Sequence, residues 1–467
     1  MAKFLSDFHD FVWGAPALVM ILGVGIFLSL KLRFAQLTLF PRALRVFFAT
    51  LLPGKGKPAG NRDSPMRALC TALAATVGTG NLVGVAGAIS LGGPGAVFWM
   101  WICAGLGMVT KFAEATLAVR YRVKTETGYA GGPMYVILQG MGKRWRPLAT
   151  AYCIFGLIAA FGVGNATQIN AVITGINGVI SQFGGQESRS GNFAMGLILA
   201  VLVGSMLLGG ARRIGEAAER LVPFASAVYL LMCIGVLSVH VTQLPKAVSS
   251  IITGAFSPRA VTGGMLGSAF QALRTGCSRG VFTNEAGMGT AAIAHASADV
   301  EQPPQQGLMG IMEVFLDTVV ICTMTALVIL VSGVPIPYGT DTGAELTSLA
   351  FCSVYGQGAA IVLVLTLCCF AFATVLGWGL YGARCAQFLF GNRTWTAFAL
   401  AQTVTVALSS LMKTQTVWSL AETVNGLMVI PNLISLAVLT PEVVRLTKEY
   451  KKTGGRAVGG GTYADFH

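Results

Sequence analysis

The stretch CTALAATVGTGNLVGVAGAISLGGPGAVFWMW, from Cys70 to Trp101, is apolar enough for a membrane, yet it carries glycine at positions 78, 80, 84 and 87. Each glycine in a helix interior costs roughly 1 kcal/mol relative to alanine. Two interpretations fit: the glycines allow close packing against another helix, or the helix breaks inside the membrane.

The composition of the whole chain predicts an all-α polytopic membrane protein. Its 467 residues are 54% hydrophobic and 11% charged, whereas a soluble domain carries about 25% charged residues. The 59 glycines and 17 prolines are spread through the apolar runs, unlike the alternating pattern of a β-barrel. A helix needs about 20 apolar residues to cross a bilayer, and we count eleven candidate runs, at 12–32, 68–91, 95–119, 148–180, 193–211, 221–242, 263–290, 307–333, 357–383, 394–411 and 416–440.

The basic residues predict the orientation in the membrane. The net charge of +13 comes mainly from Lys and Arg in alternate loops and in the C-terminal tail. By the positive-inside rule these segments are cytoplasmic and the N-terminus is outside. The charge is therefore assigned to the surface of the lipid bilayer, and no nucleic acid is expected as a partner. Asp7 and Asp10 precede the first run, which argues against a cleavable signal peptide.

Motifs for enzymatic chemistry are missing from the sequence. The ten cysteines are scattered, the four histidines form no HExxH motif, and no GxxxxGK[ST] loop is present. We therefore expect no enzyme and no organic cofactor, and any pumping must use an ion gradient. A channel is less favoured, because channels need a continuous polar ring and the polar residues here gather at glycine-rich spans.

The segment ATVGTGN offers ligands for a small zwitterion and a cation. At a break, the N-terminus of a half-helix favours a carboxylate, and freed carbonyls coordinate sodium. Thr76 and Thr79 add hydroxyl groups and Asn81 adds an amide oxygen. A transporter site is the hypothesis that follows.

Six motifs are distributed along the chain: GTGN, GGPGAVFWMW, RGVFTNEAGMGTAAIAHA (residues 279–296), GGPMYV, DTVVICTMTALVI and NGLMVIPNL. With these motifs the sequence resembles, over nearly the full chain, the alanine/glycine:cation symporter family, also called the sodium:alanine symporters. The resemblance implies a leucine-transporter-like fold of two inverted five-helix repeats after one extra N-terminal helix. The expected units are 1–67 with the extra helix and a basic loop, 68–242 and 243–440 as the two repeats, and 441–467 as a cytoplasmic tail. Spans two and seven would be the two broken helices.

The expected function is import of alanine or glycine with sodium across the bacterial inner membrane. The substrate carboxylate would meet Thr79 and Gly80, and the resemblance favours Gln168 and Trp378 as pocket residues. Asn165 lies three positions before Gln168 and either joins helices or faces the cavity. In span seven, the expected break is near Thr275, and Gly276 and Ser278 are candidates for lining the site.

The sodium site is expected where span nine meets the first break. Thr374 would supply a hydroxyl oxygen, completed by the carbonyls of Ala74 and Val77 and by Asn81. Ala373 and Val375 flank Thr374 and add no second hydroxyl, a departure from the broader fold.

Charged residues inside the spans leave an alternative open. Lys111 and Glu114 are spaced to neutralise each other, and Arg279 is expected to pair with Glu285 or to form a structural clamp with it. Other intramembrane polar residues have no partner in the sequence pattern, and a proton-coupled symporter would use such a carboxylate; they are Glu313, Asp317, Glu422 and Asn425. A non-transporting amino-acid sensor would use the same pocket.

Overall fold

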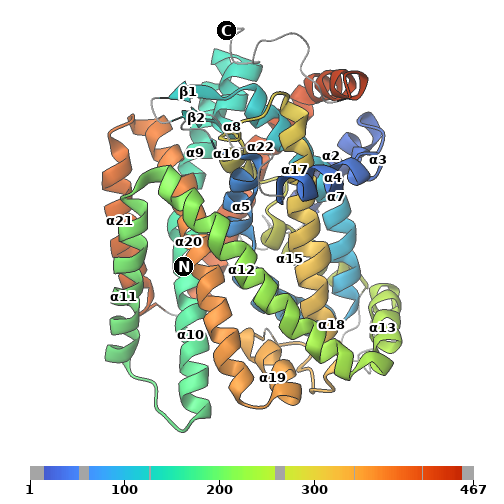
Figure 1. The fold of residues 1–467 in the computed structure, drawn as a ribbon, viewed down its shortest axis with the longest axis vertical. Helices are drawn as coiled ribbons and strands as arrows, with labels where there is room; N and C mark the ends of the chain where they lie inside the picture. The colour runs from blue at the N-terminus through green and yellow to red at the C-terminus, as the bar shows by residue number, and fades with distance from the viewer. Residues whose placement is uncertain are drawn as a thin grey trace.

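The computed structural model describes residues 15–51, 63–125, 128–257, 269–340, 342–412 and 414–454, with backbone alone at 15 and 414–422. Almost all of this is helical (Figure 1). The first part contains α2 (Ala15–Lys31), α3 (Ala35–Thr38), α4 (Phe40–Leu51), α5 (Pro65–Thr76), η1 (Gly80–Gly84), α6 (Val85–Gly92), α7 (Gly95–Arg120), β1 (Val123–Thr125), β2 (Gly128–Ala130), α8 (Pro133–Tyr135), η2 (Val136–Met141), η3 (Lys143–Trp145), α9 (Arg146–Phe161), η4 (Gly162–Ala166) and α10 (Thr167–Gln182).

In the second part, every regular element among the described residues is a helix. It contains α11 (Arg189–Leu207), α12 (Gly210–Val239), η5 (Val241–Gln243), α13 (Leu244–Phe256), α15 (Ala269–Asn284), α16 (Thr290–His295), α17 (Pro303–Val314), η6 (Phe315–Cys322), α18 (Thr323–Val331), α19 (Ala344–Tyr355), α20 (Gly358–Phe390), α21 (Thr394–Ser409) and α22 (Thr414–Lys452). The two short strands pair antiparallel, with Lys124 opposite Tyr129.

Local chemistry explains where several helices begin. Ser64 caps α5: its side chain accepts a hydrogen bond of 3.0 Å from the Arg67 N–H, and Pro65 occupies the first helical position. Gln302 and Gln305 form a reciprocal capping box at the start of α17. These caps satisfy amides that a helix start leaves without partners.

Seven helices within the described residues are long and apolar enough to cross a membrane. They are Gly95–Arg120, Lys143–Gln182, Arg189–Leu207, Gly210–Val239, Pro303–Val331, Gly358–Phe390 and Thr423–Lys452. The pair Pro65–Thr76 and Gly80–Gly92, bent by 53°, is an eighth candidate. Of the other predicted spans, the first and tenth are shorter helices and the seventh lies partly outside the described residues, so the count of eleven remains a prediction.

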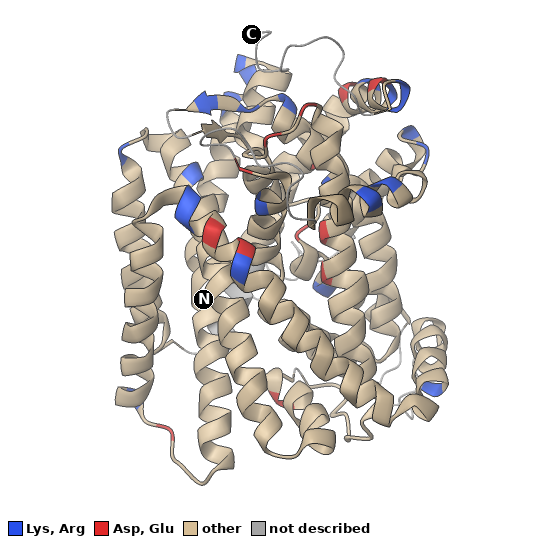
Figure 2. Ribbon diagram, in the orientation of Figure 1, with Lys and Arg blue, Asp and Glu red and all other residues tan. Residues whose placement is uncertain are grey.

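Charge is distributed unevenly along the long axis of the molecule. Figure 2 shows Lys and Arg gathered at the end that bears the β1–β2 hairpin, whereas the opposite end is nearly free of coloured residues. The basic residues of alternate loops in the sequence therefore lie together at one end of the fold.

Two long helices form the centre of the structure. α20 packs against α5, α9, α10, α12 and α21, and α7 packs along α13, α15 and α17. α7 lies very close to α13 at Gly95, where an added Cβ atom would lie 2.1 Å from the Gly254 carbonyl carbon and 2.2 Å from the Ala255 nitrogen. Both atoms belong to backbone, which cannot rotate away as a side chain does.

We predict that Gly95→Ala destabilises the protein, because its methyl group would push α13 away from α7. Overpacking of this kind costs about 1–3 kcal/mol. The matched control is Gly105→Ala in the same helix, where an added Cβ has no heavy atom within 4 Å and alanine favours the helix. Thermal unfolding in detergent should show a lower midpoint for Gly95→Ala alone; equal midpoints would contradict the prediction.

Candidate functional site

The predicted break in the first glycine-rich span is confirmed. α5 ends at Thr76, Val77 is extended with φ −77° and ψ 96°, and the helix resumes at Gly80 after a 53° bend. The Gly78 N–H donates to Asn81 Oδ1 at 2.8 Å. In a continuous helix this N–H would bond to the Ala74 carbonyl, so the break releases the Ala74 oxygen for another partner.

Side chains from two other helices face the break at Gly78. A Cβ atom on Gly78 would lie 2.6 Å from Thr374 Oγ1 of α20 and 3.4 Å from Gln168 Oε1 of α10. Gln168 Nε2 donates to the Val163 carbonyl at 3.2 Å, while Gln168 Oε1 and Thr79 Oγ1 have no hydrogen-bond partner among the described residues. Both residues are buried. The break therefore presents unused oxygens beside a released carbonyl.

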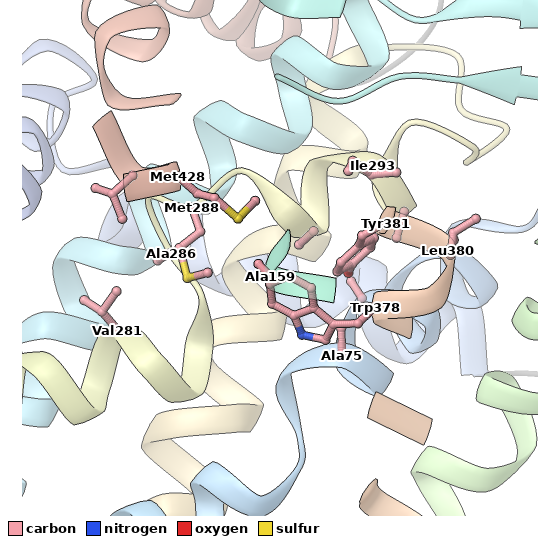
Figure 3. Packing of buried hydrophobic residues seen from close by; sticks show 14 of the residues in the cluster. Ala75, Ala159, Val281, Ala286, Met288, Ile293, Trp378, Leu380, Tyr381 and Met428 are labelled. Atoms are coloured by element: carbon pink, nitrogen blue, oxygen red, sulfur yellow. The ribbon is translucent and has the colours of Figure 1, made fainter. Parts of the chain in front are cut away.

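Trp378 lies one helical turn after Thr374 and is fully buried. Its Nε1–H donates to Glu285 Oε1 at 2.9 Å, and the ring of Tyr381 packs edge-on with centroids 5.8 Å apart. Figure 3 shows the Trp378 ring between Ala75 of the first broken helix and the Tyr381 ring, with Ala286 and Met288 of another chain segment in the same cluster. Gly164 fixes the indole from η4, because a Cβ atom there would lie 2.2 Å from Trp378 Cβ.

A second break follows α15, and it is not where the sequence predicts it. Glu285, Gly287 and Gly289 have φ of 53°, 93° and 75°, a left-handed conformation that ends the helix and that a residue such as Glu rarely adopts. The chain resumes as α16 at Thr290, whose Oγ1 donates to Glu285 Oε2 at 2.5 Å. Glu285 thus joins its own break to Trp378.

The prediction of a break near Thr275 is therefore wrong. Gly276 and Ser278 lie inside α15, seven or more residues before Glu285. A Cβ atom on Gly276 would lie 2.3 Å from the Ala96 carbonyl oxygen, so this glycine serves close packing against α7. Ser278 is half-buried on the same continuous helix.

Asp317 connects the two breaks, an arrangement that the spacing of these residues in the sequence does not predict. Asn81 Nδ2 donates to Asp317 Oδ1 at 2.7 Å, and Thr318 Oγ1 donates to Asp317 Oδ2 at 2.8 Å. Asn284 Nδ2 donates in turn to Thr318 Oγ1 at 3.1 Å, and Asn284 Oδ1 accepts from the Ala286 N–H at 3.0 Å. The Asn81 amide, expected as a sodium ligand, thus already bonds to Gly78 and Asp317 and shapes the break.

The predicted neutralisation of Lys111 by Glu114 is also wrong. Lys111 Nζ pairs with Glu313 Oε1 at 2.8 Å, and His295 Nε2 lies 2.8 Å from Glu313 Oε2. Glu114 Oε1 instead accepts from the N–H groups of Gly287 and Gly289 at 3.0 and 3.1 Å. The two residues are neighbours on α7, but their side chains bind different elements.

The remaining predicted polar residues have separate environments. Asn165 Nδ2 donates to the Gln402 carbonyl of α21 at 3.0 Å, the helix-joining alternative of its two interpretations. Asn425 is buried on α22, and neither its Oδ1 nor its Nδ2 has a partner within the described part of the chain. The side chain of Glu422 lies outside the described residues.

A cavity of about 370 Å³ is lined by residues of the β-hairpin and of several helices. Its lining includes Thr71 of the first broken helix, Ile293 of α16 and Leu380 of α20, with Tyr129 and Arg384 nearer the β-hairpin. Ile293 and Leu380 flank Tyr381 in Figure 3. The cavity therefore reaches both broken helices.

Comparison with known proteins gives matches that cover nearly the whole chain. Residues 1–458 match the sodium:alanine symporter family. The sodium/alanine symporter AgcS of Methanococcus maripaludis is 40% identical over 453 residues, which cover 96% of this chain and 97% of AgcS. The probable sodium/glutamine symporter GlnT of Bacillus subtilis is 36% identical over 453 residues, covering 96% of this chain and 90% of GlnT.

The fold comparison agrees. The crystal structure of MhsT in complex with L-phenylalanine matches with a TM-score of 0.56 at 14% identity, covering 84% of this chain and 99% of MhsT. At this identity the likeness concerns the fold, which is that of the leucine-transporter-like carriers. The protein is a multi-pass membrane transporter of amino acids and not an enzyme, and it belongs to the sodium:alanine symporter family.

Proposed function

We propose that the protein imports a small neutral amino acid, alanine or glycine, together with sodium across the bacterial inner membrane by alternating access. The observation that carries this proposal is the convergence of Thr374 Oγ1 and Gln168 Oε1 on Gly78 at the break. Oxygens suit a hard cation, and the N-terminus of a half-helix suits a carboxylate. AgcS, the sodium/alanine symporter among the relatives, supports the choice of substrate and ion.

The substrate carboxylate would bind at the start of the second half-helix. η1 begins at Gly80, and the amides of its first turn carry partial positive charge. Thr79 Oγ1 is buried beside them without a partner among the described residues. Gln168 and Trp378 would then bound the side-chain pocket, with the indole held by Gly164 and Glu285. This tight packing favours a small side chain over the glutamine named for GlnT.

Sodium would bind on the other side of the break. The Ala74 carbonyl is released by the bond from Gly78 N–H to Asn81, and Thr374 Oγ1 lies across from Gly78. The Val77 carbonyl would join them, because Val77 is the extended residue at which α5 stops. Substrate and ion would thus share one broken segment, which is how binding of one favours binding of the other.

The cytoplasmic side is assigned to the basic end of the molecule. The positive-inside rule favours this orientation for the Lys and Arg seen in Figure 2. The cavity that reaches Thr71, Ile293 and Leu380 lies toward that end and would be the path of release into the cell.

The direct test is uptake of labelled alanine into liposomes that contain the purified protein. We expect accumulation with an inward sodium gradient, no accumulation when potassium replaces sodium, and competition by glycine but not by glutamine. Alanine binding without accumulation would instead identify a sensor. Uptake that proceeds without any sodium would overturn the sodium assignment.

Gly78→Ala should reduce sodium-driven alanine uptake by about tenfold or more. The added methyl would overlap Thr374 Oγ1 at 2.6 Å and displace the oxygens from the break, and a loss of about 1.4 kcal/mol in binding is a factor of ten. Gly84→Ala is the matched control in the same span, since its Cβ would meet its nearest neighbour only at 4.0 Å. Equal uptake by the two variants would contradict this site.

Thr374→Val should raise the sodium concentration needed for half-maximal uptake by about tenfold, because it keeps the shape and removes one oxygen ligand. Thr366→Val is the control: Thr366 lies on the same helix and makes the same kind of hydrogen bond, to Val362 at 2.8 Å, as Thr374 makes to Phe370 at 3.0 Å. If both variants keep the wild-type sodium dependence, Thr374 is not a sodium ligand.

A further inference from the structure

Carboxylates outnumber cations in the buried centre of the molecule. Among the described residues, the charged side chains with at most 2% of their surface exposed are one lysine and four carboxylic acids, namely Lys111, Glu114, Glu285, Glu313 and Asp317. An ionised carboxylate inside a membrane is costly unless it is paired or hydrogen-bonded. At least one of these groups therefore needs a further source of neutralisation.

Three of the four carboxylates have donors on both oxygens. Glu313 accepts from Lys111 on one oxygen and lies against His295 on the other. Asp317 accepts from Asn81 and Thr318. Glu285 accepts from Trp378 and Thr290. Donors on both oxygens suit the ionised form of a carboxylate.

Glu114 has a different pattern. Its Oε1 accepts three hydrogen bonds, from the Gly287 N–H at 3.0 Å, the Gly289 N–H at 3.1 Å and Asn432 Nδ2 at 2.6 Å. Its Oε2 is buried and has no partner among the described residues. Oε2 of Glu114 is therefore the one oxygen of the four carboxylates that no donor reaches among the described residues. A proton can bind there without displacing a hydrogen bond, whereas ionisation leaves a buried, charged oxygen bare.

The groups around Glu114 leave it without a cation of its own. The ammonium of Lys111 is bonded to Glu313, and His295 lies between Glu313 and Gln306. The titratable side chains that interact electrostatically with Glu114 are Lys111 of α7, Tyr152 of α9, Glu313 of α17 and Tyr381 of α20. Glu285 of the second break, His295 of α16 and Asp317 of η6 belong to the same buried cluster through Lys111 or Glu313. The phenol oxygens of Tyr152 and Tyr381 also have no partner within the described residues, although both side chains are buried.

We propose that Glu114 is a proton-binding site, with the proton on Oε2, and that this proton is exchanged with water during each transport cycle. The step is an ionisation: water delivers a proton to the carboxylate, and the same O–H bond breaks when the proton leaves. The inference rests on the proposed function, because it adds a proton to a cycle driven by sodium. Glu114 is not one of the residues that form the site at Gly78.

The position of Glu114 explains how its proton would affect transport. Its Oε1 holds the loop of the second break, and Asn432 ties the same carboxylate to α22 and donates to the Gly287 carbonyl at 2.9 Å. Charged acceptors make stronger hydrogen bonds than neutral ones. Ionised Glu114 would therefore hold the loop to α7 and α22, and protonation would loosen a loop that also carries Glu285 and its bond to Trp378.

The test compares wild type with Glu114→Gln in proteoliposomes that carry an inward sodium gradient and a trapped pH-sensitive dye. Gln keeps an acceptor oxygen for Gly287 and Gly289 but cannot bind or release the proton. We expect wild-type uptake to fall by about tenfold for each pH unit above the pKa of the site, with a lumenal pH change that requires alanine. Glu114→Gln should lower sodium-driven uptake, and the uptake that remains should have a flat pH profile and no dye signal.

The matched control is Glu187→Gln, which removes one carboxylate from an exposed loop and should behave as wild type. If wild type takes up alanine with sodium but gives no dye signal, and Glu114→Gln keeps its pH profile, this inference fails while the proposed function stands. Absence of sodium-driven uptake in wild type would instead count against the proposed function.

Infrared spectroscopy tests the proton independently of transport. A buried carboxylic acid gives a carbonyl band that shifts in heavy water, and this band should be present in wild type and lost in Glu114→Gln. An identical band in both proteins would overturn the inference. The inference would also be overturned if the band is missing from wild type and Glu114→Gln requires more sodium for uptake. Glu114 would then be identified as a sodium ligand. If Glu114→Gln does not fold, titration of the wild-type band decides, because a band that is absent at all pH values excludes the proton.

Discussion

A helix that stops inside a membrane leaves amides and carbonyls without partners, and the architecture of this transporter depends on how these groups are satisfied. At the first break, the side chain of Asn81 accepts the hydrogen bond that the Gly78 amide would make to a carbonyl in a continuous helix. At the second, Glu114 does the same for Gly287 and Gly289. Each break is thus stabilised by a polar side chain, and the oxygens that remain unpaired become available to a solute.

The carboxylates link these breaks to the surrounding helices. Asp317 of η6 joins Asn81 to Asn284 through Thr318, so the two broken helices share one hydrogen-bonded chain. Glu285 binds Trp378 of α20, and Glu114 binds Asn432 of α22. A movement at either break must therefore alter bonds at the other, and these contacts would couple the two breaks in the proposed alternating access.

The sequence predicted the parts whose cause is local. Glycines in an apolar span mark the first break, because their cost in a helix needs a reason, and the break lies at the predicted Gly78. The second break was misplaced because it occurs at Glu285, whose left-handed backbone accompanies hydrogen bonds to Thr290 and Trp378 that spacing in the sequence does not reveal. Lys111 was assigned to its helical neighbour because spacing alone cannot show a partner 202 residues away. The links through Asp317 are hidden for the same reason.

The π-helical segments η1, η2, η4 and η6 have a consequence for how such a protein changes over evolution. Each π turn accommodates one residue more than an α turn, and one residue corresponds to about 100° of rotation around the helix axis. Losing that residue would restore an α turn and rotate the following segment, carrying Thr167 and Gln168 after η4 to another face. Insertions and deletions in this fold are therefore not confined to loops: a single codon gained or lost within a span could reassign which side chains face the solute.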